Sequence, residues 1–309
     1  MTTFRSSSSR LVDVGNGSGG GSGSARVEDA VLSDRAIGDI IRQANSLTAD
    51  QVEQILNYQR ERGVRFGEAA VALGLAKTED VLWALSQQFH YPYAPDKSRL
   101  NPELVAATQP FSFQAEAFRA MRSNLIMRLY KADEARRALA IVSPDQGDGK
   151  TFFAANMAVA FSQLGGRTLL IDADMRNPRL HDLFGIENTG AGLSGILSGR
   201  TATNVISPVP ALPSLFVLPV GTVPPNPLEL VERPAFDLLI RELLGKFDYV
   251  IVDTPAGSLG TDGPVIAAKC GAALVVAREN QSRLDALQDL LDMVNAGAPH
   301  VCGVVLNEF

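Results

Sequence analysis

The sequence predicts an α/β protein, a doubly wound and mostly parallel sheet preceded by a small all-α domain. Three observations predict this fold class. Apolar runs typical of strands alternate with helical segments over residues 138–307. Several of these runs are continuously apolar, as strands buried on both faces of a parallel sheet are. Two of the runs end in acids, and another enters a glycine-rich turn that opens a helix, which predicts a ligand site at the carboxyl ends of the strands.

The length and composition of the chain limit its class. A chain of 309 residues suggests about two domains, and a hydrophobic fraction of 46% is ample for a packed core. The net charge of −6 argues against nucleic acid as the main ligand. Cys270 and Cys302 lie in apolar runs, so we expect buried free thiols in a reducing compartment. With neither a signal peptide nor a spanning helix in the pattern, we expect a cytoplasmic protein that a partner brings to the inner membrane.

The first third of the chain is organised around a repeat. Residues 1–34 are predicted to be a disordered Ser/Gly-rich tail, because they cannot bury enough apolar area to offset chain entropy. Residues 35–93 are predicted to form short amphipathic helices in two similar halves, with a period of 29 residues. Thr48 and Thr78 each stand before acids that favour a first helical turn, where each is expected to cap a helix N-terminus. A proline-rich linker is expected over 94–111.

The second domain is expected over 112–309. It opens with a helix over 113–130 and continues as alternating strands and helices. The expected strands are 138–143, 167–172, 214–220, 248–253, 272–277 and 301–307.

The first strand leads into a phosphate-binding loop. The segment SPDQGDGKT (143–151) joins that strand to a helix, and its glycines allow backbone N–H groups to turn toward phosphates at the helix N-terminus. Pro144 stands where the general pattern has its first glycine. Lys150 is expected to reach the β- and γ-phosphates, and the Thr151 hydroxyl to bind magnesium. The residues expected to bind ATP are Gly147, Asp148, Gly149, Lys150, Thr151 and Phe152. The domain is therefore predicted to be of the P-loop NTPase type.

Three acids follow strands of the same predicted sheet. Asp172 and Asp174 come at the end of one strand, and Asp253 ends another. Acids at the carboxyl ends of strands can bind Mg²⁺ together with Thr151, and Asp172 or Asp174 can also accept a hydroxyl proton, with Lys150 completing the catalytic set. The alternative for Asp174 is a simple ion pair with Arg176.

These motifs, with PPNPLEL (224–230), resemble the catalytic domain of bacterial tyrosine kinases that regulate exopolysaccharide chain length. The resemblance covers roughly 112–309 and includes Arg176-Asn177-Pro178, which is similar to the Arg-x-Pro that closes the family's second acidic motif. It also includes a Glu-x-x-Arg-x-x-Arg helix that in the family mediates ring-shaped self-association, formed here by Glu116, Arg119 and Arg122. The alternative reading of these three residues is a solvated charge pair on one helical face.

Two departures from the family concern its substrates. Members usually end in a tyrosine cluster that is phosphorylated in trans, whereas this chain ends VVLNEF. Tyr249 begins an apolar strand and is expected to be core, which leaves Tyr91 and Tyr93 as the better exposed tyrosines. Many members are also fused to a membrane domain. The resemblance therefore implies a separate membrane partner, a chain-length determinant or polysaccharide co-polymerase, and a homo-oligomer.

Other resemblances are weaker. The septum-positioning and plasmid-partitioning ATPases share the predicted fold, but they carry a lysine where this loop has Asp145. The helical module resembles the N-terminal domain of type II secretion ATPases, some of which bind cyclic di-GMP. Arg65, Gly67 and Gln88 match parts of that motif. The alternative for the module is a protein-docking or purely structural role.

The sequence thus predicts an ATP- and Mg²⁺-dependent protein-tyrosine kinase that regulates exopolysaccharide chain length, polymerisation or export. The alternative from another class is a non-catalytic ATP-binding switch, or an ATPase of the partitioning type, that gates a polysaccharide assembly machine. The absence of a C-terminal tyrosine cluster favours that alternative.

Overall fold

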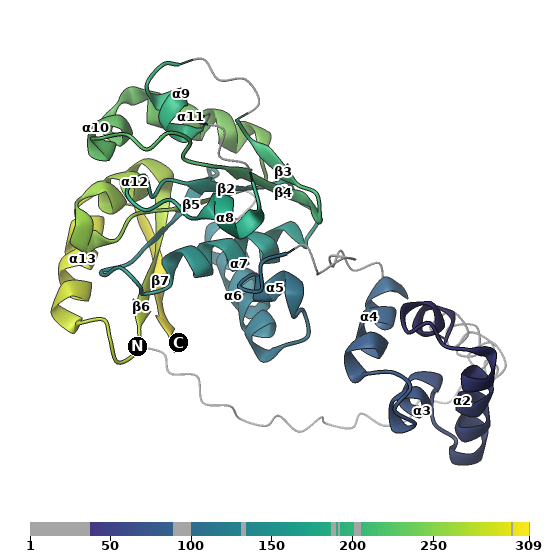
Figure 1. Cartoon of the computed structure of the whole chain (residues 1–309). Helices are drawn as coiled ribbons and strands as arrows, with labels where there is room; N and C mark the ends of the chain where they lie inside the picture. Colours follow the sequence, from purple (N-terminus) through teal and green to yellow (C-terminus); the bar gives the residue numbers. More distant parts are fainter. Residues whose placement is uncertain are drawn as a thin grey trace, which may run out of the picture. The chain divides into compact units, whose positions relative to one another are not determined.

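The computed structural model describes residues 38–88, 100–130, 134–186, 190, 192–200, 205–297 and 299–308. The chain divides into two compact units, Met1–Phe89 and His90–Phe309 (Figure 1). The predicted tail over 1–34 lies outside the described residues.

The first unit is helical and shows the repeat. Residues 38–44 are helical and are followed by α2 (Ala49–Arg62), α3 (Phe66–Ala72) and α4 (Thr78–Gln88). Helix α4 begins 29 residues after α2, in agreement with the predicted period. Thr48 caps α2 as predicted, since its hydroxyl accepts from Gln51 N at 3.3 Å and the Gln51 side chain accepts from Thr48 N at 2.9 Å. Thr78 is the first helical residue of α4 rather than its cap.

The helical unit has its own apolar core. Ile41, Ile55, Phe66 and Ala84 are buried in it. Gly67 lies so close to α4 that a Cβ at this position would come within 2.6 Å of a Val81 methyl group. A side chain at residue 67 would therefore push α3 away from α4.

The second unit is built on a seven-stranded sheet with the order β3-β4-β2-β5-β1-β6-β7. All neighbouring strands are parallel except β3 and β4, which are antiparallel. The strands are β1 (Ala138–Val142), β2 (Thr168–Asp172), β3 (Ser207–Val209), β4 (Leu212–Leu218), β5 (Tyr249–Asp253), β6 (Gly271–Arg278) and β7 (His300–Asn307). The helices are α5 (Val105–Thr108), α6 (Phe113–Leu129), α7 (Lys150–Ser162), α8 (Leu180–Phe184), α9 (Leu193–Leu197), α10 (Pro227–Glu232), α11 (Pro234–Lys246), α12 (Asp262–Cys270) and α13 (Leu284–Ala296), with a 3₁₀ turn η2 (Gly257–Leu259).

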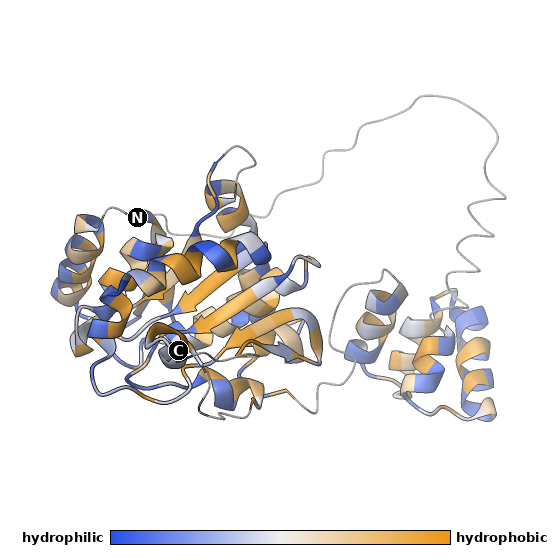
Figure 2. Cartoon of the chain, turned by 90° about the horizontal axis from the view of Figure 1, so that it is seen from above, coloured by the Kyte–Doolittle hydropathy of each residue, from blue (hydrophilic) through white to orange (hydrophobic). Residues whose placement is uncertain are grey.

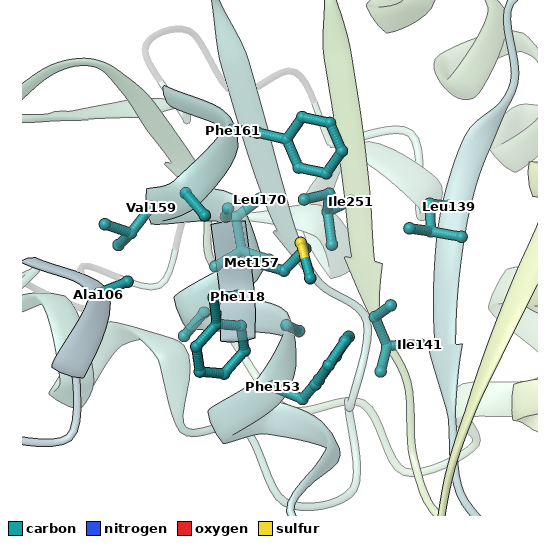
Figure 3. Packing of buried hydrophobic residues seen from close by; sticks show 14 of the residues in the cluster. Ala106, Phe118, Leu139, Ile141, Phe153, Met157, Val159, Phe161, Leu170 and Ile251 are labelled. Carbon is teal, nitrogen blue, oxygen red and sulfur yellow. The ribbon is translucent and has the colours of Figure 1, made fainter. Parts of the chain in front are cut away.

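Helices cover both faces of this sheet, so the doubly wound prediction is confirmed. Alternate residues of β1 point to opposite faces. Leu139 and Ile141 join the core beneath α5, α6 and α7, where Phe118, Phe153 and Met157 pack (Figure 3). Ala138, Ala140 and Val142 join the core beneath α11, α12 and α13. The central strands are therefore apolar on both sides, as the orange strands between the helices show (Figure 2).

Part of the expected linker belongs to the second unit's core. Residues 104–107, which the sequence assigns to a linker over 94–111, are at most 7% exposed and include most of α5. The buried side chain of Asn156 on α7 holds this segment. Its Oδ1 accepts from Ala106 N at 2.9 Å, and its Nδ2 donates to Glu103 O at 2.8 Å. Prolines suggested a linker here, but these hydrogen bonds satisfy the backbone and allow it to be buried.

The strand β3 was not predicted. It has three residues and contains Pro208, which lies at the sheet edge where a missing N–H costs no ladder hydrogen bond. The two cysteines are free and buried, as predicted. Among the described residues, no helix combines the length and apolar character needed to cross a bilayer.

Replacing Asn156 by alanine should destabilise the second unit. The change leaves the buried Ala106 N without its partner, which costs about 1–3 kcal/mol, and also removes the part-buried bond to Glu103 O. Urea unfolding should show this loss. The matched control is Asn124→Ala, because Asn124 is exposed on α6 and bonds only to Ala120 O of its own helix. Equal stability of the two variants would contradict the bracing role of Asn156.

Candidate functional site

The turn between β1 and α7 has the backbone of a phosphate cradle. Gly147 and Gly149 have φ of 90° and 92°, values that side-chain-bearing residues rarely adopt. At Gly149 a Cβ would also lie 2.3 Å from Asn307 Nδ2. The turn leads directly into α7, so backbone N–H groups and the helix N-terminus face the same space.

The side chain of Asp148 braces this loop. It is 3% exposed, its Oδ2 accepts from Asp145 N at 2.8 Å, and its Oδ1 accepts from Ser282 Oγ at 2.7 Å. The Asn307 amide also donates to the Asp148 carbonyl at 3.0 Å. The carboxylate is therefore fully used within the protein, and any ligand contact by Asp148 has to come from its backbone N–H.

The three residues after Gly149 have different surroundings. Lys150 is 6% exposed, and its Nζ lies 3.5 Å from Asp174 Oδ2. The Thr151 side chain is hydrogen-bonded to Asp253. The Phe152 ring packs on α6, with its centroid 6.0 Å from that of Phe118. Lys150 and Thr151 are placed toward the acids, whereas the Phe152 ring is placed toward α6.

The strand register brings two of the acids together. Strand β5 lies between β1 and β2, and Asp253 is the direct partner of Asp172 across the β2–β5 pair. Asp172 is fully buried and Asp253 is 1% exposed. Asp172 Oδ2 accepts from the backbone N–H groups of Arg179 and Leu180 at the start of α8. One carboxylate oxygen on each acid, Oδ1, is buried without a hydrogen-bond partner among the described residues.

Burial of this pair strongly affects its protonation. Burial raises the pKa of Asp172 well above its usual range, and the neighbouring Asp253 raises it further. Burial likewise raises the pKa of Asp253 to about 7, against the opposing effects of Lys150 and Thr151. Two unpartnered carboxylate oxygens on neighbouring strand ends fit a divalent cation, which would neutralise both acids.

A cation here needs ligands beyond the protein. No group of three His, Cys, Asp or Glu side chains in the described part of the chain is arranged to hold a metal by itself. Mg²⁺ commonly binds through one or two carboxylates, waters and substrate phosphates. The set of Thr151, Asp172 and Asp253 beside a phosphate loop fits that pattern.

Asp174 is engaged differently from the other two acids. Its Oδ1 accepts from Arg176 N and Asn177 N at 3.2 and 2.9 Å, and its Oδ2 faces Lys150. The alternative that Asp174 pairs with the Arg176 guanidinium is wrong. That guanidinium donates instead to Asp262, with a shortest distance of 2.9 Å. Asp262 is 1% exposed and was not identified from the sequence, where it reads as an ordinary acid opening α12.

The expected self-association residues make contacts within the chain. Arg119 donates to Glu116 and to Pro110 O, so the predicted intrahelical pair is present. Arg122 donates to Ala160 O at 2.6 Å, which ties α6 to α7. Of the two paired side chains, Glu116 is the more exposed, at 68% against 22% for Arg119.

The structure does not support the cyclic dinucleotide site expected at Arg65, Gly67 and Gln88. Arg65 is exposed at the start of α3, and its backbone N–H donates to the Glu68 carboxylate. The tight packing of Gly67 on Val81 gives that glycine a structural reason. Gln88 is the last residue of α4.

The tyrosines of the second unit that the structure describes are structural. The rings of Tyr130 and Tyr249 meet edge-on with centroids 5.0 Å apart, and both contact Phe161. The Tyr130 hydroxyl is buried without a hydrogen-bond partner among the described residues. Tyr249 begins β5, so this cluster lies at the amino ends of the central strands, opposite the carboxyl ends that lead to the phosphate loop. Tyr91 and Tyr93 lie outside the described residues.

Comparisons of the sequence with known proteins agree with this geometry. A family model described as "ParA: NUBPL iron-transfer P-loop NTPase" matches residues 134–308. The tyrosine-protein kinase CpsD of Streptococcus agalactiae is 32% identical over 193 residues, which cover 62% of this chain and 82% of CpsD. The tyrosine-protein kinase YwqD of Bacillus subtilis is 30% identical, over 68% of this chain and 87% of YwqD. The tyrosine-protein kinase Wzc of Salmonella typhimurium is 35% identical, but the match spans only 28% of Wzc.

Solved structures extend the likeness to three dimensions. The chimerical protein CapA2B2 superposes with a TM-score of 0.63 at 32% identity, covering 75% of this chain and 99% of that one. The kinase domain of the Escherichia coli tyrosine kinase Etk superposes with a TM-score of 0.62 at 31% identity, covering 66% and 79%.

Stability should depend on pH through Asp253. Its pKa is about 7 in the folded chain and about 4 in an unfolded one, so the free energy of unfolding should fall as pH rises between these values. In metal-free protein, the free energy of unfolding should fall between pH 5 and pH 8. The fall should be about 2–3 kcal/mol smaller for Asp253→Asn than for the unaltered chain. Chemical denaturation across this range in the presence of a chelator measures the difference.

The control for this experiment is Asp289→Asn, which changes an exposed acid on α13. It should follow the pH dependence of the unaltered protein. Parallel curves for all three proteins would show that Asp253 is ionised alike in the folded and unfolded chains.

Proposed function

Because the chain belongs to the bacterial tyrosine kinases built on the P-loop NTPase fold, we propose that it phosphorylates tyrosines of its own kind and of a membrane partner during capsule or exopolysaccharide assembly. The chain is a protein-tyrosine kinase. The identity of its acceptors and the process that it regulates belong to the proposal. The observation that carries the proposed chemistry is the unpartnered oxygen of Asp172 beside Asp253, on the same strand ends as the phosphate loop.

The loop and Lys150 bind the nucleotide in this proposal. Inward-facing N–H groups of residues 147–152 accommodate the phosphates of ATP, and Lys150 neutralises charge that develops on the β- and γ-phosphates. Asp174 keeps Lys150 at the mouth of the loop through the 3.5 Å ion pair. Mg²⁺, held by Thr151 and Asp253, would supply further charge neutralisation and would leave Asp172 Oδ1 to the acceptor.

Asp172 receives the acceptor hydroxyl. The tyrosine oxygen forms a bond to the γ-phosphorus, the bond between that phosphorus and the β–γ bridging oxygen breaks, and ADP leaves. The phenolic proton passes to the Asp172 carboxylate. Both oxygens of Asp174 already have partners, whereas Asp172 keeps Oδ1 for this task. A carboxylate with a raised pKa is also the better proton acceptor near neutral pH.

The partner is a separate membrane chain-length determinant or polysaccharide co-polymerase in this proposal, and the regulated step is chain length, polymerisation or export. Support comes from the motif resemblance to exopolysaccharide kinases. The described residues hold no bilayer-spanning helix, so the membrane contact in this proposal comes through that partner. We also propose that the kinase self-associates through the exposed side of α6 around Glu116.

Two substitutions test the chemistry. Lys150→Met keeps an unbranched side chain without charge, and Asp172→Asn keeps the shape without the carboxylate. Each should lower phosphoryl transfer from labelled ATP to tyrosine by about 100-fold or more, since both act on charge that develops in the transition state. Asp182→Asn is the matched control, because Asp182 is a 75% exposed acid on the neighbouring helix α8.

The unaltered protein decides between the two classes of function. Labelling of tyrosine on the protein itself or on its membrane partner supports the proposal. If the protein binds or hydrolyses ATP and labels no tyrosine on either, the nucleotide switch takes the kinase's place. Full activity of Asp172→Asn would instead leave the kinase in place and remove Asp172 as the proton acceptor.

Self-association is tested separately with Glu116→Lys. The change reverses an exposed charge on α6 and should lower the mass measured by light scattering in the presence of Mg²⁺ and ATP. Glu242→Lys is the matched control, since Glu242 also forms an exposed intrahelical pair, with Lys246 on α11. An unchanged mass for Glu116→Lys, or a monomeric unaltered protein, would leave Glu116 and Arg119 as a solvated pair.

A further inference from the structure

The motif PPNPLEL (224–230) has no part in the chemistry derived above, yet it forms one side of a cavity of about 460 Å³. The other side comes from α9 and the residues next to it. The polar side chains that line the cavity are Ser194, Ser198, Arg200, Thr222, Asn226, Glu229 and Arg233.

Hydrogen bonds and close backbone contacts fix the walls of this cavity. Ser194 Oγ donates to Thr222 O at 2.5 Å, and Thr222 Oγ1 donates to Gly190 O at 3.2 Å. A Cβ at residue 192 would lie 2.4 Å from the backbone of Gly221, so the two segments can meet only where a glycine is present. Pro227 is buried in the first turn of α10. The cavity is therefore formed before any ligand arrives.

The charges of the lining favour an anion. Arg200 and Arg233 are exposed and supply two guanidinium groups. Arg233 is oriented by its bond to Leu197 O at 3.4 Å. The one acid in the lining, Glu229, accepts from Asn226 Nδ2 at 3.1 Å. Guanidinium groups match carboxylates well, and the remaining hydroxyl and amide groups suit a peptide backbone.

The cavity lies on the opposite side of Asp172 from the phosphate loop, in terms of strand order. The cavity follows the carboxyl end of β4, and β4 is the neighbour of β2, which carries Asp172. The phosphate loop follows β1, which lies beyond β5 on the other side of β2. Figure 1 shows α9 and α10 beyond the strands β2 and β4. The cavity therefore lies on the side of β2 away from the nucleotide, the side left to an acceptor tyrosine.

We propose that the cavity between α9 and the PPNPLEL segment binds acidic residues that flank the acceptor tyrosine of a protein substrate. Carboxylates of the substrate pair with Arg200 and Arg233, and the tyrosine is thereby directed to Asp172. This inference rests on the proposed role of Asp172 as the residue that faces the acceptor. It makes the cavity a specificity site for the substrate rather than a part of the catalytic machinery.

The test compares two synthetic peptides with one central tyrosine, flanked by glutamates in one peptide and by glutamines in the other. The unaltered kinase should label the glutamate peptide with the higher kcat/KM. The double variant Arg200→Gln, Arg233→Gln should lose about five- to tenfold on the glutamate peptide through KM, with little change on the glutamine peptide or in the KM for ATP. Arg241→Gln is the matched control, because Arg241 is exposed on α11 and does not line the cavity.

A binding measurement separates docking from chemistry. The probes are the same two peptides, fluorescently labelled and with phenylalanine in place of tyrosine. The unaltered protein should bind the glutamate peptide more tightly than the glutamine peptide. The double variant should bind both with the same affinity. Equal kinetics of both peptides with the unaltered kinase would overturn the proposal while leaving the kinase activity intact. A loss confined to binding of a phosphotyrosine peptide would also overturn it, since the cavity would then hold the product's phosphate. Absence of labelling of either peptide, with normal binding of the glutamate peptide, would count against the proposed kinase chemistry instead.

Discussion

The pairing of β2 with β5 is the constraint on which the rest of the second unit depends. It places Asp172 and Asp253 side by side at the buried ends of two strands. Two carboxylates in apolar surroundings repel each other and lose hydration, so they persist only where nearby groups compensate for them. Lys150, Thr151 and the first N–H groups of α8 lie where they can do so. The fold therefore maintains a site that is favourable for cations and for protons.

The phosphate loop depends on segments far away in the chain. Ser282, just after β6, and Asn307, the last residue of β7, hold Asp148, and Arg278 donates to Gly147 O at 3.3 Å. These residues lie more than a hundred positions after the loop, but β6 is the direct neighbour of β1 and β7 follows it. The closing strands of the sheet thus fix the backbone that receives the nucleotide. Loosening of the β6–β7 edge should affect the loop before it affects the acids.

Local patterns in the sequence were enough to predict most of the fold. All six predicted strands are present, because continuously apolar runs bounded by turns leave little choice of structure. Strand β3 was missed because three residues with a central proline carry almost no strand signal. The positions of Lys150, Thr151, Asp172 and Asp253 followed from motif order. The contacts of Asn156, Asp262 and Ser282 could not be predicted, since each depends on a partner fixed by tertiary packing that leaves no local signature.

The distribution of groups along the sheet connects the chemistry with the choice of substrate. Tyr130 and Tyr249 pack against the core at the amino ends of the strands, opposite the phosphate loop, so neither lies where it can reach Asp172 of its own chain. An acceptor tyrosine must then be presented by another segment, and a kinase with a preformed site gains selectivity only from contacts beyond the phenol ring. Along the strand order, the phosphate loop, the buried acids and the arginine-lined cavity succeed one another at β1, β5 with β2, and β4. The same parallel sheet that aligns the nucleotide with the acids therefore also fixes where a substrate segment has to be held.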